Sequence, residues 1–76
     1  MKIEIYGTGC PKCRKLFENA QEAVKIKGVD AEVVKVEDIN EIMNAGVMMT
    51  PAIAVDGSVK SSGKVLGVDD IKGLLT

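Results

Sequence analysis

Histidine is absent from the 76-residue sequence, and its absence excludes several kinds of active site. Without it the chain forms no Ser-His-Asp or Cys-His nucleophile and no metal centre with imidazole ligands. Aromatic residues make up only 3% of the chain, so it lacks the stacking surfaces that single-stranded nucleic acids need. Chemistry on this chain must therefore come from cysteine, carboxylates, lysine or the single tyrosine, Tyr6.

The chain also has no excess of either charge and no long apolar run. It carries 10 basic and 11 acidic residues, a net charge of −1 at pH 7. This near balance argues against nucleic-acid partners and against a polybasic membrane surface. No stretch approaches the roughly 18 apolar residues of a spanning helix, and Glu4 interrupts the pattern of a signal peptide. We expect a cytoplasmic protein that contacts neither nucleic acid nor membrane, and we expect a monomer.

Cysteine is scarce too, with two residues in the chain. Two cysteines form at most one internal disulfide, which excludes a secreted scaffold built on disulfides. They also cannot complete a four-ligand zinc site by themselves. A chain of 76 residues has the size of one small domain, and 46% hydrophobic residues support a modest core. We therefore expect a single domain over residues 1–76.

The apolar pattern predicts strands that alternate with helices. Apolar residues at steps of three and four mark a long helix, and Gly28 is expected to end it in a left-handed conformation. Asp38 is expected to open a short helix that turns Ile39, Ile42 and Met43 inward. Asp56-Gly57 predicts a tight hairpin turn. The predicted order is strand, helix, strand, helix, strand, strand, helix, over residues 2–6, 10–27, 31–36, 38–45, 52–55, 58–60 and 69–75.

One sharp motif, Cys10-Pro11-Lys12-Cys13, lies where the first predicted strand meets the long helix. Pro11 suits the first helical turn, where its missing N–H is not needed. Residues three apart in a helix face the same side, with Cβ atoms about 5–6 Å apart, near the reach of a disulfide. We therefore interpret the cysteines as a redox pair. The plainer interpretation is that they are two small buried hydrophobic residues.

The two thiols of this pair have different expected roles. Cys10 lies at the helix start, where free backbone N–H groups and the helix dipole favour a negative charge. Thiols in such positions have pKa values of about 3.5–7.5, and Lys12 and Arg14 add positive potential nearby. Cys10 is therefore predicted to be the exposed nucleophile. Cys13 lies one turn deeper on the apolar face and is predicted to be the less ionised, resolving thiol.

Two further positions have both a functional and a plain interpretation. In the plain interpretation, Thr50-Pro51 is an ordinary proline at the start of a strand. In the functional one, it is a cis peptide beside the thiols that exposes the Thr50 backbone to a bound chain. Glu4 is an acid in a strand that we expect to be central. It either lies buried near Cys13 and exchanges protons with it, or it is a half-exposed residue under the short helix.

With these residues in place, the chain resembles the thioredoxin/glutaredoxin superfamily, and most closely the small thioredoxin-like redox-active disulfide proteins of archaea and bacteria. The resemblance covers essentially the whole chain. Residues 7–13 match the active-site loop of the family, and Met49-Thr50-Pro51 matches the element before its third strand. The resemblance implies an α/β minimal thioredoxin fold, βαβαββα, with a four-stranded mixed sheet and helices on both faces.

The resemblance also implies roles for the motif residues. Cys10 would attack and Cys13 would resolve, supported by Pro11 and Lys12 of the same motif. Gly9 stands where thioredoxins normally have tryptophan, at a position that contacts the substrate.

The second matching element has implied roles of its own. Pro51 would be cis and pack against the disulfide, and Thr50 would offer backbone hydrogen bonds to the substrate chain, with Met49 beside it. Glu4 stands six residues before the first cysteine, where thioredoxins often carry a buried acid. Residues 67–70 resemble the glutathione-binding turn of glutaredoxins, and the use of glutathione stays open.

The function that follows is thiol–disulfide oxidoreductase. The protein would reduce disulfides of target proteins through a mixed disulfide, and a flavoprotein reductase or a thiol donor would re-reduce it. No cofactor or metal is needed within the chain. The alternative is a Cu(I) carrier that uses the same thiols, although such carriers usually run strand-helix-strand-strand-helix-strand. A third possibility is a redox-regulated binding module without turnover.

Overall fold

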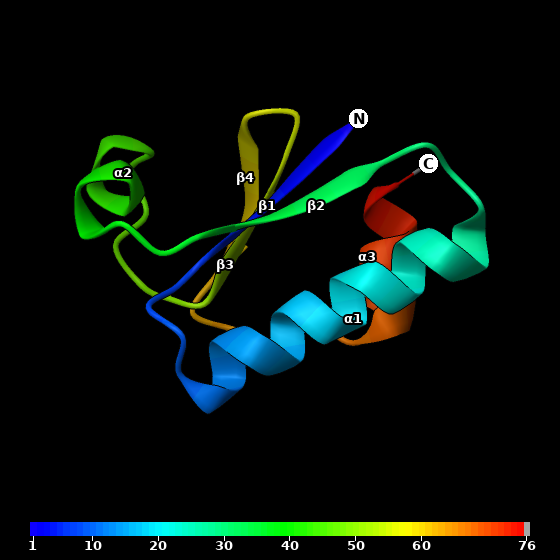
Figure 1. The fold of residues 1–76 in the computed structure, drawn as a ribbon, viewed down its shortest axis with the longest axis horizontal. Helices are drawn as coiled ribbons and strands as arrows, with labels where there is room; N and C mark the ends of the chain where they lie inside the picture. The colour runs from blue at the N-terminus through cyan, green and yellow to red at the C-terminus, as the bar shows by residue number, and fades with distance from the viewer. Residues whose placement is uncertain (76) are drawn as a thin grey trace.

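The computed structural model describes residues 1–75, and its elements follow the predicted order (Figure 1). Their bounds differ from the prediction by at most two residues. The elements are β1 (Lys2–Tyr6), α1 (Pro11–Lys27), β2 (Glu32–Val36), α2 (Ile39–Asn44), β3 (Ala52–Val55), β4 (Ser58–Ser62) and α3 (Val68–Leu74).

The four strands form one mixed sheet in the order β2-β1-β3-β4. Strand β1 pairs in parallel with β2 and antiparallel with β3, so β1 is a central strand as expected. Tyr6 at the end of β1 lies opposite Ala52 at the start of β3. The loop that follows β1 and the segment that precedes β3 therefore meet at the same end of the sheet.

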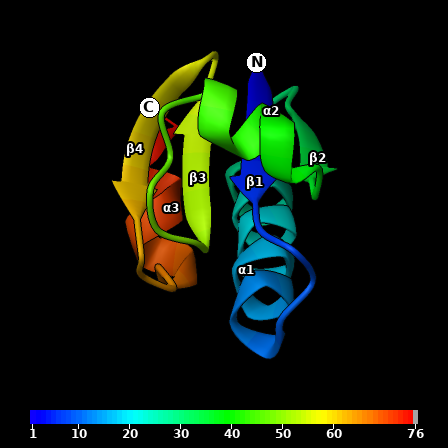
Figure 2. The ribbon, with the colours of Figure 1, turned by 90° about the vertical axis from the view of Figure 1, so that its left-hand side faces the viewer.

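Helices cover both faces of the sheet, as predicted: α1 and α3 lie on one face, and α2 lies over the other (Figure 2). Side chains alternate between the faces along each strand. The α1 face holds the larger core, with Ile3, Ile5, Leu16, Ala20, Ala23, Ile53, Val55, Ile71 and Leu75. The α2 face holds a smaller one, with Tyr6, Val36, Ile42, Val47, Ala52 and Ala54.

The predicted cap and turn signals appear in the structure. Gly28 ends α1 with φ of +69°, and its N–H donates to the Val24 carbonyl at 2.9 Å. Asp56 and Gly57 both have positive φ, 51° and 84°, as a type I′ hairpin turn requires. The Asp56 carboxylate also accepts from the Lys2 N–H at 2.8 Å, which ties the hairpin to the start of β1.

The prediction that α2 turns three apolar residues inward was wrong for two of them. Ile42 is buried, but Ile39 is 61% exposed and Met43 is 69% exposed. The helix has six residues, less than two turns, so only one narrow stripe of it reaches the sheet. Ile39 and Met43 lie four residues apart, and therefore share the stripe that faces away.

Candidate active site

The loop between β1 and α1 places both cysteines at the end of the sheet. The Gly7 N–H donates to the Val36 carbonyl at 3.0 Å, which extends the pairing of β1 with β2 by one residue. Gly9 has φ of +90°, a conformation that L residues rarely adopt, and it turns the chain into the helix. Cys10 is the extended N-cap residue of α1, and its carbonyl accepts the first helical hydrogen bond, from Arg14 N–H at 3.0 Å.

The two sulfurs lie together at the helix start. Cys10 Sγ and Cys13 Sγ are 2.7 Å apart, and both cysteines are free thiols. The Cys13 backbone N–H donates to Cys10 Sγ at 3.4 Å. Cys10 thus has the part that a Ser, Thr or Asp oxygen usually has at an N-cap. Cys10 is partly exposed, whereas Cys13 is 5% exposed, as the apolar face of α1 predicted.

The surroundings shift the two thiols in opposite directions. The Cys13 thiol lowers the pKa of Cys10 by hydrogen bonding to it, and the backbone N–H groups of Cys13 and Lys12 lower it further. Burial raises the pKa of Cys13, and its hydrogen bond to Cys10 raises it again. Since the thiolate is the nucleophile, these opposite shifts favour the reactive form at Cys10 over Cys13. Lys12 acts on Cys10 through its backbone N–H, whereas the sequence suggested its side-chain charge.

Gly7 leaves the space that Cys13 occupies, a role that the sequence analysis missed. A Cβ at residue 7 would overlap Cys13 Sγ and lie 2.8 Å from Cys13 Cβ. The φ of Gly7 is not positive, so close approach of the helix is the reason for glycine here. In the sequence, the feature that could have predicted this role is the place of Gly7 between a strand and the helix that carries Cys-x-x-Cys.

Replacing Gly7 with alanine is expected to push Cys13 away from its place and to destabilise the fold. Overpacking of this kind costs about 1–3 kcal/mol, so we expect a lower urea midpoint and slower closure of the Cys10–Cys13 disulfide. Exposed Thr8, replaced by alanine, is the matched control and should change neither quantity. A Gly7→Ala protein with the stability and closure rate of the native one would contradict this role.

The segment before β3 has the geometry expected of it. The Thr50–Pro51 peptide is cis, Pro51 is buried, and Thr50 is exposed. Because Tyr6 lies opposite Ala52, Pro51 is at the sheet end that carries the cysteines. The Pro51 carbonyl accepts from the Gly63 N–H at 2.9 Å. Met49 is 64% exposed, and so offers an apolar surface next to Thr50.

Glu4 does not lie where the proton-exchange hypothesis needs it. In the register of β1 and β3 it lies opposite Ala54, a residue of the smaller core, so its side chain is on the α2 face. Cys13 belongs to α1, which covers the other face. Glu4 is half-buried beside Tyr6, whose pKa is raised by burial and then by the charge of Glu4. The structure therefore agrees with the plainer interpretation of a half-exposed residue under the short helix.

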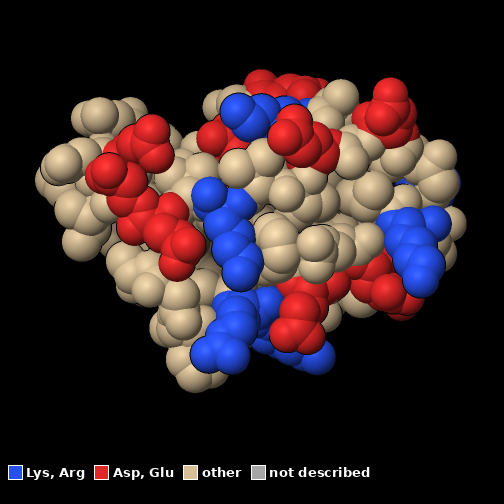
Figure 3. All heavy atoms as spheres, in the orientation of Figure 1, with Lys and Arg blue, Asp and Glu red and all other residues tan. Residues whose placement is uncertain are grey.

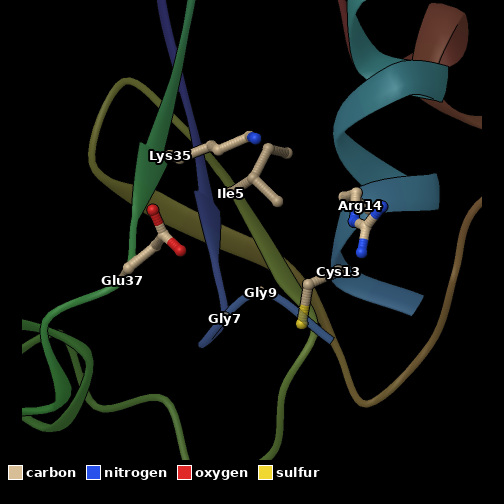
Figure 4. Close-up of a pocket in the computed structure, with 7 residues that line it drawn as sticks. All are labelled: Ile5, Gly7, Gly9, Cys13, Arg14, Lys35 and Glu37. Atoms are coloured by element: carbon tan, nitrogen blue, oxygen red, sulfur yellow. The ribbon is translucent and has the colours of Figure 1, made fainter. Parts of the chain in front are cut away.

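A small pocket beside Cys13 contains polar side chains that the sequence analysis did not single out (Figure 4). Lys35 of β2 lies opposite Ile5 of β1 and so faces α1, and Glu37 follows β2 directly. The Lys35 ammonium is 4.6 Å from the centre of the Phe17 ring. These residues approach Cys13 only through the parallel pairing of β1 with β2. The lining residues are Ile5, Gly7, Gly9, Cys13, Arg14, Lys35 and Glu37.

Charge around the site is mixed. In Figure 3 basic side chains lie near the start of α1, and acidic side chains gather over the α2 end of the same face. Lys12, Arg14 and Lys15 are all exposed. Within residues 1–75, no three side chains of the His, Cys, Asp and Glu types converge as a metal site would require. Across the same residues, no helix has the length and apolar character to span a membrane.

The Cu(I)-carrier alternative is not better supported by this architecture. Such carriers usually have two consecutive strands after the first helix. In this chain α2 separates β2 from β3, and α3 follows the last strand among the described residues. The arrangement of elements matches the thioredoxin order instead.

Comparison with known proteins agrees with the geometry. The family model described as a thioredoxin domain matches residues 1–76. A thioredoxin of Methanothermobacter thermautotrophicus is 47% identical over 76 residues, 100% of this chain and 99% of the relative. A thioredoxin of Methanocaldococcus jannaschii is 49% identical over 70 residues, 92% of this chain and 80% of the relative. The chain therefore belongs to the thioredoxin family, and it is a thiol–disulfide oxidoreductase, a disulfide reductase that carries electrons as a dithiol.

Proposed function

We propose that Cys10 and Cys13 perform this reaction in a fixed order on disulfides of other proteins. The Cys10 thiolate attacks one sulfur of a target disulfide, and the other target sulfur leaves as a thiolate. Cys13 then attacks Cys10 Sγ, so that the Cys10–Cys13 bond forms and the bond to the target breaks. The target gains two electrons, and the protein is left oxidised. The opposite shifts in pKa of two adjacent sulfurs carry this assignment.

The proposed binding site for the target chain is the segment 49–51 together with Gly9. Among residues 1–75, no hydrogen bond occupies the backbone N–H or carbonyl of exposed Thr50. An extended chain bound there would pair with these groups as an added strand does. Met49 would contact its apolar side chains, since methionine adapts to varied surfaces. Gly9 is exposed and adds no side chain that would block the approach to Cys10.

Both sulfurs belong to one chain and lie together at the start of α1, so we propose that a monomer with a single domain over residues 1–76 suffices for this chemistry. We place its work in the cytoplasm, where such disulfides are transient and catalytic. A separate donor must return two electrons to the Cys10–Cys13 disulfide in each cycle. We propose a flavoprotein reductase or a small thiol, and glutathione is one thiol to compare.

The reduction of insulin by dithiothreitol, with and without the protein, tests the proposal. We expect acceleration by the native protein and none by a variant in which serine replaces both cysteines. In parallel, the affinity of the reduced protein for Cu(I) is measured by titration against a competing chelator. Tight copper binding without acceleration would support the carrier instead. A reversible disulfide with neither activity would indicate a redox-regulated binding module.

A further inference from the structure

The pocket beside Cys13 is a route by which its buried thiol can exchange a proton. Cys13 is 5% exposed and lines this pocket on the α1 side. During ring closure a target is bonded to Cys10, so it covers the sulfur on that side. The other walls of the pocket come from β1, β2, the loop between β1 and α1, and Glu37 after β2. In Figure 4 the Cys13 sulfur and Arg14 lie on one side of it, and Glu37 lies on the other.

Few of the side chains lining this pocket can accept a proton at neutral pH. Arginine and lysine are already protonated there, which excludes Arg14 and Lys35. Isoleucine and glycine have no basic group, and the chain has no histidine. Among the described residues that line the pocket, Glu37 alone carries a carboxylate.

The structure also holds this carboxylate close to the active-site loop. A Cβ built on Gly9 would lie 3.2 Å from Glu37 Oε2, so the carboxylate packs against the residue that precedes Cys10. Glycine at that position leaves the space that the carboxylate uses. Lys35 and Arg14 are the other charged side chains that line the pocket.

We propose that Glu37 takes up the proton of the Cys13 thiol, through water in the pocket that both residues line, when the Cys10–Cys13 disulfide closes. This inference rests on the proposed order of attack. It gives to Glu37 the part that the sequence suggested for Glu4. Glu37 follows the end of β2 on the side of the sheet that faces α1, whereas Glu4 faces α2.

The Cys13 S–H bond breaks, and its proton goes to a Glu37 carboxylate oxygen. The Cys13 thiolate attacks Cys10 Sγ, the sulfur–sulfur bond between Cys10 and Cys13 forms, and the target leaves with the electron pair of the broken disulfide. Glu37 then releases the proton to solvent. When a donor reduces the protein again, the same carboxylate can return a proton to Cys13.

The two steps can be separated with 5,5′-dithiobis(2-nitrobenzoate) under stopped flow. Attack by Cys10 releases the first coloured thiolate, and closure by Cys13 releases the second. At pH 7 we expect Glu37→Gln to leave the first phase within about twofold and to slow the second about tenfold or more, a modest loss for a proton-transfer group. Glu37→Asp, which keeps a carboxylate, should be slowed less. Added acetate should accelerate the second phase of Glu37→Gln more than that of the native protein.

Glu4→Gln is the matched control, because it removes the same charge from the other face and should change neither phase. A second phase of native rate in Glu37→Gln would overturn the proposal. So would a slow phase that neither acetate nor aspartate restores, since that result indicates a purely structural role. If the native protein releases only one thiolate, the proposed order of attack fails instead.

Discussion

Replacing Cys10 with serine is expected to abolish disulfide reduction. A serine hydroxyl does not form the soft anion that attacks a disulfide sulfur. Removal of an attacking nucleophile can cost an enzyme about 10⁶-fold in rate. We therefore expect insulin reduction by dithiothreitol at the rate measured without protein.

The fold should survive this change, because serine is among the preferred N-cap residues and its oxygen can accept from the Cys13 N–H. Thermal unfolding of the Cys10→Ser protein should thus occur close to the native midpoint. Activity that persists in a folded Cys10→Ser protein would mean that Cys13 attacks first, contrary to its burial.

Replacing Cys13 with serine is expected to stop the reaction at the mixed disulfide. The serine hydroxyl can still donate a hydrogen bond to Cys10 Sγ, and the backbone N–H donor is unchanged, so Cys10 keeps its nucleophilicity. Only ring closure is lost. Well-oriented intramolecular reactions have effective molarities of about 10⁵ M or more, so free thiols at millimolar concentration replace Cys13 very poorly. The mixed disulfide should live several orders of magnitude longer than in the native protein.

Mass spectrometry of Cys13→Ser after exposure to a disulfide-containing protein measures this directly. The adduct should be joined through Cys10 and should disappear on treatment with dithiothreitol. Cys10→Ser, treated in parallel, should form no comparable adduct. If instead Cys10→Ser accumulates the adduct and Cys13→Ser does not, the assigned order is reversed.

Local patterns in the sequence were sufficient for the helices, the strands and the cysteine pair. The long helix follows from the spacing of Leu16, Ala20 and Ala23, and the hairpin follows from Asp56-Gly57, whose backbone has the required positive φ. Cys10 at the N-cap follows from its place before Pro11. Each of these features depends on residues that lie close together in the sequence.

The errors and omissions lie where distant segments meet. The alternation of side chains along β1 puts Glu4 and Ile5 on opposite faces of the sheet. Which of the two faces α1 covers depends on the crossover that leads from β1 to β2. Lys35 reaches the Cys13 pocket because the parallel register places it opposite Ile5, and Glu37 follows two residues later. Ile39 is exposed because α2 is too short to wrap around the sheet edge.

The most direct test of the account is the pH dependence of alkylation at each cysteine of the reduced protein. Iodoacetamide reacts with the thiolate, and peptide mapping assigns the product to Cys10 or Cys13. Because the pKa of Cys10 is lowered and that of Cys13 is raised, Cys10 should still react at pH values below the titration of free cysteine, about 8.5. Cys13 should react only above that range. Coincident profiles, or a Cys10 profile like that of free cysteine, would contradict the account.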